Sequence, residues 1–153
     1  MSYIGFDDLI QQLSEALDTD LAPDANGACQ MIIDEALAIQ LEPSETEEHI
    51  LIGTQIFELP PGPYRTDVLK QALIFNGAPT PPLETLCYIQ QNSRLALYRY
   101  LPTKALDAPK LLDALSSFIA TAFEWKEALD AGHNAPAKTY LTKDPAPSPF
   151  DIK

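Results

Sequence analysis

Three runs of alternating apolar residues, separated by short polar breaks, most constrain how this chain can fold. The runs cover residues 29–33, 37–41 and 50–57, and the turn signal Asn26-Gly27 comes just before the first. Period-two alternation with β-branched residues and short breaks is the signature of antiparallel hairpins. The prolines between residues 60 and 63 end this pattern, because proline cannot donate the ladder hydrogen bond. The sequence therefore predicts three strands in succession.

Three other segments show apolar residues at helical spacing. The spacing predicts helices over residues 4–18, 66–76 and 109–132. The last helix begins with a proline in its first turn and ends at a glycine, which are the preferred places of both residues. Its main apolar stripe consists of Leu111, Leu115, Phe118, Ala122, Trp125 and Leu129.

Two further strands are predicted between the second and third helices, over residues 85–90 and 95–101. Both faces of the second of these strands carry large residues, so we expect it to be covered on both sides. The complete order is α-β-β-β-α-β-β-α. It predicts an α+β fold, in which helices pack on a single antiparallel sheet.

The length of 153 residues suits one domain with a single core. We expect the domain to cover residues 1–132. Residues 133–153 contain four prolines and little apolar periodicity, so they are predicted to form a mobile tail.

The charge of the chain is strongly acidic and unevenly distributed. There are 22 acidic and 10 basic residues, for a net charge of -12, and no lysine or arginine precedes Arg65. Binding to phosphates needs clustered cations, so neither nucleic acid nor anionic lipid is an expected partner. No run approaches the roughly 18 apolar residues that a membrane helix needs, and the first residues lack the basic start of a secretory signal. A partner with basic segments is favoured instead.

No catalytic or metal-binding motif is present. The sequence contains no P-loop, GxGxxG, HExxH or CxxC pattern. His49 and His133 lack neighbours at metal-ligand spacing and are interpreted as surface residues, and the acidic run 45–48 as a solvated loop. The sequence therefore predicts a protein that is not an enzyme, with no catalytic residue, metal or cofactor.

Two pairs of residues leave alternatives open. Asp34-Glu35 fits a paired-carboxylate site or a hairpin turn, and the turn is favoured. Cys29 and Cys87 both lie in apolar runs, where cysteine usually behaves as a small apolar residue. A reducing compartment is their simplest setting, without a disulfide between them.

The order of the elements and several local patterns resemble the class I chaperones of bacterial type III secretion, the Tir chaperone-like family. The resemblance covers about Ile4 to Leu129, and departs from the family in the proline-rich loop 78–82 and after Gly132. Its matching stretches are residues 29–34, 37–41, 56–60 and 69–76, the two-strand segment 86–101 and the last helix as far as Trp125.

The resemblance implies a chaperone in the bacterial cytoplasm. It would bind the N-terminal region of secreted effectors, keep it competent for secretion and deliver it to the export apparatus, with the secretion ATPase or sorting platform as a further partner. It also implies a homodimer, through Leu69, Leu73, Leu86 and Tyr88. Helix and sheet surfaces of the kind that receive effector segments in this family consist here of Leu9, Leu13, Leu17, Cys29, Met31, Leu37, Ile39 and Leu41. The same apolar residues fit a plain core equally well.

Two other functions remain open at this point. One is that of a regulatory protein with the same fold and no effector client, as in the YbjN-like group. The other is a small-molecule enzyme with a site between sheet and helices, which the absence of catalytic motifs disfavours.

Overall fold

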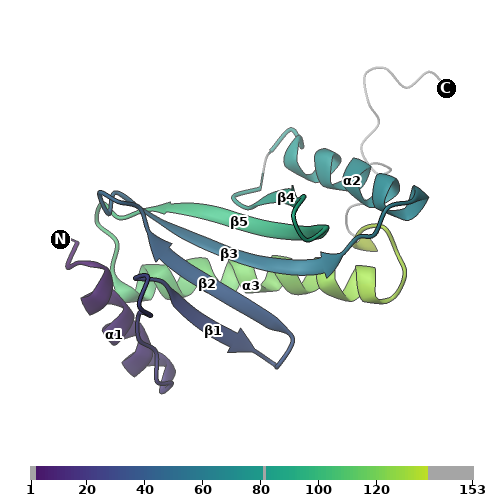
Figure 1. The fold of residues 1–153 in the computed structure, drawn as a ribbon. Helices are drawn as coiled ribbons and strands as arrows, with labels where there is room; N and C mark the ends of the chain where they lie inside the picture. Colours follow the sequence, from purple (N-terminus) through teal and green to yellow (C-terminus); the bar gives the residue numbers. More distant parts are fainter. Residues whose placement is uncertain (1–2, 81, 138–153) are drawn as a thin grey trace.

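The computed structural model describes residues 3–80 and 82–137. It confirms the predicted order of helices and strands and the α+β class (Figure 1). The elements are α1 (Phe6–Leu17), β1 (Cys29–Ile33), β2 (Leu37–Pro43), β3 (His49–Glu58), α2 (Pro63–Asn76), β4 (Thr85–Ile89), β5 (Arg94–Pro102) and α3 (Ala108–Asp130).

The five strands form one sheet in the order β1-β2-β3-β5-β4, and all neighbours are antiparallel. Asp34 and Glu35 join β1 to β2 with φ angles of 51° and 56°. Two consecutive positive φ angles are typical of a tight hairpin turn whose twist matches that of the strands. The hairpin interpretation of Asp34-Glu35 is therefore confirmed.

One face of the sheet is covered by α1 and α3, which lie on the same side (Figure 1). Alternate strand residues such as Ile39, Ile52 and Leu97 point into this layer and are fully buried. The predicted stripe of α3 is buried along its whole length, from Leu111 to Leu129. Apolar burial of this kind is the main source of stability for the fold.

The opposite face of the sheet has no helix over it among the described residues. This corrects the expectation that residues 95–101 are covered on both sides: Tyr100 is 60% exposed. The large residues of β5 that point outward are tyrosines, whose rings supply apolar surface while their hydroxyl groups tolerate water. Size alone was therefore a poor indicator of burial at this strand.

Helix α2 lies beyond the edge strand β4 (Figure 1). It begins at Pro63, earlier than the predicted residue 66, because a proline at the first helical position loses no hydrogen bond. Val68 and Ala72 are its buried residues, and the Phe75 ring meets Trp125 of α3 edge to face at 5.6 Å. This is the least buried of the three helices.

The side chain of Asn76 closes the outer edge of β4. Its Nδ2 donates to the Leu86 carbonyl and its Oδ1 accepts from the Leu86 N–H, both at 2.9 Å. An edge strand otherwise presents such groups unpaired. One amide therefore occupies the backbone position where a further strand would pair.

The packed chain continues past the predicted boundary at residue 132. Ala135 and Pro136 are buried, and the Tyr64 hydroxyl donates a hydrogen bond to the His133 carbonyl. Most of the predicted tail, residues 138–153, lies outside the described residues, so its mobility stays a prediction.

The start of α1 is held by a residue 41 positions away. Gly5 offers no capping side chain, and the Glu47 carboxylate instead accepts hydrogen bonds from the Phe6 N–H at 2.9 Å and the Tyr3 hydroxyl at 3.0 Å. Glu47 lies in the β2–β3 turn. The backbone carbonyl of Glu47 accepts a hydrogen bond from the Thr103 hydroxyl. A carboxylate at a helix N-terminus pairs an orphan donor and complements the helix dipole.

We expect Glu47→Ala to lower the free energy of unfolding by about 1 kcal/mol, the usual cost of losing a helix cap. The change should appear as a lower urea midpoint with an unchanged slope. Glu45→Ala, at an exposed position of the same turn, is the matched control and should have little effect. Equal midpoints for the two variants would show that the cap contributes nothing.

The free energy of unfolding should also decrease at high pH because of Tyr3. Partial burial raises the pKa of Tyr3, and its hydrogen bond to Glu47 and the negative charge there raise it further. Unfolded tyrosine ionises near pH 10. The contribution of Tyr3 to the free energy of unfolding is therefore complete below about pH 10. It is lost as the pH rises toward the higher pKa that Tyr3 has in the folded protein. Urea unfolding between pH 8 and pH 11 should show a smaller loss for Tyr3→Phe than for wild type, and equal losses would contradict this role of Tyr3.

Candidate functional site

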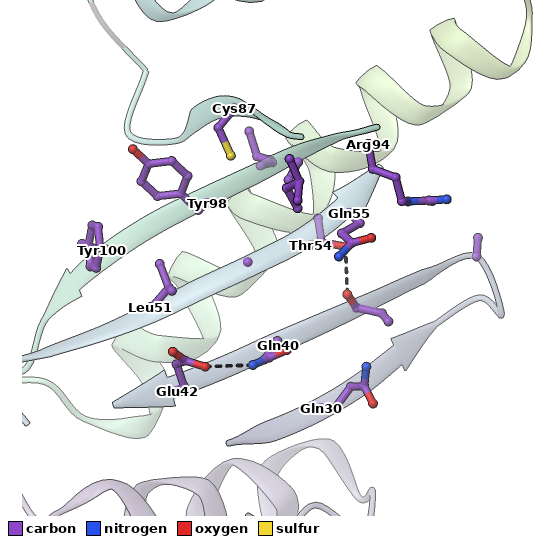
Figure 2. A pocket seen from close by; sticks show the side chains of 16 residues that line it. Gln30, Gln40, Glu42, Leu51, Thr54, Gln55, Cys87, Arg94, Tyr98 and Tyr100 are labelled. Atoms are coloured by element: carbon purple, nitrogen blue, oxygen red, sulfur yellow. Dashed lines mark hydrogen bonds between the residues drawn. The ribbon is translucent and has the colours of Figure 1, made fainter. Parts of the chain in front are cut away.

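A hollow of about 680 Å³ lies on the uncovered face of the sheet (Figure 2). We call this surface the open face. It is formed mainly by outward-pointing residues of all five strands, together with Ala36 of the β1–β2 turn and with Thr54 and Leu97, whose side chains belong to the covered side. The complete lining is Gln30, Ala36, Ala38, Gln40, Glu42, Leu51, Gly53, Thr54, Gln55, Cys87, Ile89, Arg94, Ala96, Leu97, Tyr98 and Tyr100.

Small residues form the floor of this hollow. Gly53 sits on β3 in the middle of the sheet, paired with Gln40 on one side and Tyr98 on the other. Ala38 and Ala96 point outward from the neighbouring strands β2 and β5. Since short side chains lie between longer ones, the face is concave rather than flat.

The walls of the hollow carry larger and more polar groups. On β5, the rings of Tyr98 and Tyr100 pack edge to face at 5.7 Å. On β2, the Gln40 amide donates to the Glu42 carboxylate at 2.8 Å (Figure 2). Apolar rings with adaptable amide groups are typical of surfaces that bind peptides.

The charges of the open face lie at its two ends. Arg94 stands at the start of β5 and Glu42 near the end of β2, on opposite sides of the hollow (Figure 2). Cys87 also lines it, and burial raises the pKa of this thiol, so it stays protonated and is a poor nucleophile at neutral pH. The arrangement is suited to binding a chain and offers no activated group for chemistry.

Residues 3–80 and 82–137 contain no group of three or more histidine, cysteine, aspartate and glutamate side chains placed to hold a metal ion. Within the same residues, no helix is both long and apolar enough to cross a bilayer.

The structure places seven of the eight predicted effector-binding residues in the core. Leu9, Leu13, Cys29, Met31, Leu37, Ile39 and Leu41 are all buried between the sheet and its helices. Only Leu17, at the end of α1, is partly exposed, at 37%. The reason is strand parity: these strand residues point to the side that α1 and α3 cover, so they are not available at the surface of the folded chain.

The predicted dimer residues are brought together around α2 and β4. Leu73 is 71% exposed on α2, and Leu69 and Tyr88 are half-buried. Leu86 is buried and forms part of the core. Among the predicted dimer residues, Leu73 therefore has the most exposed side chain.

Sequence reasoning missed the residues of the open face. Ala38, Gln40 and Gly53 alternate with the apolar residues that the pattern emphasised, and Tyr98 was interpreted as part of a covered strand. The available signal was the small size of Ala38, Gly53 and Ala96 at outward positions of three neighbouring strands. This signal can be recognised only once the order of the strands in the sheet is known.

Similar folds occur among solved structures. A chain of the HopA1–SchA chaperone–effector complex is 24% identical, with a TM-score of 0.64, over 79% of this chain and 92% of that one. A chain of the ExsC–ExsE complex is 16% identical, with a TM-score of 0.68, over 79% and 90%. YbjN, a putative transcription regulator from E. coli, is 12% identical, with a TM-score of 0.58, over 86% and 97%. These likenesses establish the fold, which chaperones and YbjN share.

No curated protein matches the sequence significantly. The profile of the Tir chaperone protein family, however, matches residues 8–126, from α1 into α3. This match covers most of the chain. The chain therefore belongs to the Tir chaperone protein (CesT) family.

Proposed function

We propose that the protein binds the N-terminal region of a type III secreted effector and keeps that region unfolded until export. The observation that carries this proposal is the open face, a concave surface across five strands that no helix of residues 3–80 and 82–137 covers, in a chain of the Tir chaperone family. The HopA1–SchA neighbour is itself a chaperone–effector complex. A binding surface without reactive groups agrees with a holding role rather than an enzymatic one.

The client would bind as an extended segment. Among the described residues, β1 pairs only with β2, so its outer edge can accept an added strand. Ile32 of β1 points to the open side and is 67% exposed. Main-chain pairing at β1 with side chains lying in the hollow would hold a client without requiring it to fold.

The remaining steps follow from the same role. The chaperone would act in the bacterial cytoplasm, deliver the client to the export apparatus, and meet the secretion ATPase or the sorting platform there. The acidic surface of the first 64 residues would attract a basic client segment, and this attraction should weaken with salt.

We propose that the protein is a homodimer through α2 and β4. Leu73 and its neighbour Ile74 are both exposed on α2, at 71% and 38%, and adjacent exposed apolar side chains of this kind indicate a surface that a partner covers. Light scattering at micromolar concentration should give twice the chain mass of 16.8 kDa. Leu73→Glu should give the monomer mass with the helix content unchanged, whereas Lys104→Glu, which adds a negative charge at an exposed position of the β5–α3 loop, should stay dimeric. A wild-type monomer at this concentration contradicts the dimer.

The function itself is tested by co-expression with a candidate effector encoded beside the gene. We expect the effector's N-terminal region to co-purify with the chaperone and to be protected from protease only in the complex. The same effector without this region should not be retained. Failure to retain any neighbouring secreted protein would support a YbjN-like regulatory role instead.

A further inference from the structure

Gly53, at the centre of the open face, is a glycine that the fold itself does not require. Its φ angle lies outside the left-handed region, and the register shift of β3 lies further along, between Gln55 and Phe57. A Cβ added at Gly53 would have one neighbour within 4 Å beyond the adjacent residues of the chain, the Leu97 carbonyl oxygen at 3.8 Å. Neither a turn, a bulge nor a tight backbone contact therefore explains this glycine.

The space above Gly53 is open. Its cross-strand neighbours are Gln40 and Tyr98, but no atom of either lies within 4 Å of the point that a Cβ would occupy. An aromatic ring can cover a glycine of the neighbouring strand, but the Tyr98 ring packs edge to face with Tyr100. Glycine in the interior of a strand is unfavourable, and it marks places where a ligand approaches closely. Gly53 therefore indicates a gap for a side chain of the client.

The charge beside this gap is negative. Among the described residues that line the open face, Glu42 is the only acid, and Arg94, the only base, lies at the opposite end (Figure 2). Across the sheet, Glu42 pairs with Leu51, and Leu51 pairs with Tyr100. Neighbouring strands lie about 4.8 Å apart, so roughly 10 Å separates the backbones of Glu42 and Tyr100. A planar cationic group fits between a carboxylate and a ring at this separation.

Both of these side chains are accessible to a ligand. Tyr100 is 60% exposed and Glu42 is half-buried. The Glu42 carboxylate accepts one hydrogen bond, from the Gln40 amide, whereas a carboxylate can accept about four. Neither residue belongs to the surface of α2 and β4 that we assign to the dimer, so the site stays available in a dimer.

We propose that the open face binds an arginine side chain of the client, with its stem in the gap over Gly53 and its guanidinium between Glu42 and Tyr100. The guanidinium would donate to the Glu42 carboxylate and stack on the Tyr100 ring. Arginine fits better than lysine, because its planar head forms two parallel hydrogen bonds with a carboxylate and also stacks on aromatic rings. This inference rests on the proposed function, since it names the residue by which the open face recognises an effector segment.

Titration of the isotope-labelled full-length protein with short peptides, followed by two-dimensional NMR, tests the site. The probe is acetyl-Thr-Val-Arg-Val-Thr-amide, and its matched control carries citrulline, which keeps the stem and the planar head but has no charge. We expect the arginine peptide to shift the Gly53 amide resonance and to bind about tenfold tighter than the citrulline peptide, through an ion pair and a cation–π contact. An unchanged Gly53 resonance at millimolar peptide, or equal affinities for the two peptides, overturns the proposal.

A charge variant locates the guanidinium. Glu42→Gln keeps the shape of the side chain and should make the two peptides bind equally. Glu45→Gln removes a charge at an exposed position outside the hollow and should leave the preference for arginine unchanged. An equal loss of preference in both variants would show that the peptides respond only to net charge, which contradicts the site.

Gly53→Val separates binding from stability. Valine favours strands, so the variant should have a higher urea midpoint than wild type, while its side chain fills the gap and abolishes binding of the arginine peptide. Gly53→Ala adds only the Cβ, for which the structure has room, and should show both effects to a smaller degree. Wild-type affinity in both variants contradicts the site. No effector is used in these titrations, so their failure is distinguishable from a failure of effector co-purification.

Discussion

Ile39→Glu should leave the chain unfolded. Ile39 is completely buried on β2, in the layer beneath α1 and α3, and a glutamate there would be surrounded by the apolar side chains of the core. Burial of an unpaired charge belongs to the few changes that cost about 4 kcal/mol or more, which is comparable to the whole stability of many domains. Circular dichroism should show the loss of sheet and helix signal, and Leu13→Glu should behave in the same way.

The matched control is Leu17→Glu, on the same helix as Leu13 but with a partly exposed side chain. It should remain folded with a midpoint close to that of wild type. Comparing Ile39→Glu with Leu17→Glu also decides whether the predicted effector-binding residues are core residues or contact residues. If Ile39→Glu folded normally and had lost only its effector, Ile39 would be a contact residue after all.

Ala38→Phe should lower the affinity for an effector segment about 100-fold, a loss typical of blocking the centre of an interface. Ala38 is next to Ile39 in sequence but points to the other side of the sheet, where it is exposed on the floor of the open face. A phenylalanine ring there would fill the hollow without disturbing the core. Isothermal titration with the N-terminal effector segment measures the change.

Ala120→Phe is the control for added apolar surface, because Ala120 is exposed on α3 and lines none of the hollows. It should bind the effector with wild-type affinity. If Ala38→Phe also bound at wild-type affinity while folded, the client would not occupy the open face.

The sequence was sufficient to predict the helices and strands. It was not sufficient to predict which side chains point to the covered face of the sheet and which to the open face. Alternation identified β1 to β3, and the stripe of α3 identified its buried side. Which strand face the helices would cover depends on how α1 and α3 pack against the sheet, and no local pattern states that. Apolar residues such as Ile39 and Leu41 therefore fit a binding surface and a core equally well in the sequence, and the structure places them in the core.

The contacts that fix the ends of the elements could not be predicted either. The Glu47 carboxylate caps α1 from 41 residues away, and Glu84 meets Arg99 and Thr121 from two other elements. These pairs obey ordinary rules of capping and charge, but nothing in the spacing of the residues marks them as neighbours. The starts of α2 at Pro63 and of α3, with a proline in its first turn, had readable local reasons.

The amide of Asn76 has a consequence for how copies of this protein can assemble. Joining the β1 edge of one copy to the β4 edge of the next would build a continuous ribbon of sheets, since head-to-tail contacts that do not close by symmetry grow without limit. Asn76 already occupies the Leu86 backbone groups that such a junction needs. The β4 edge is therefore closed to strand pairing at Leu86, which disfavours such a ribbon although the outer edge of β1 pairs with no other described strand.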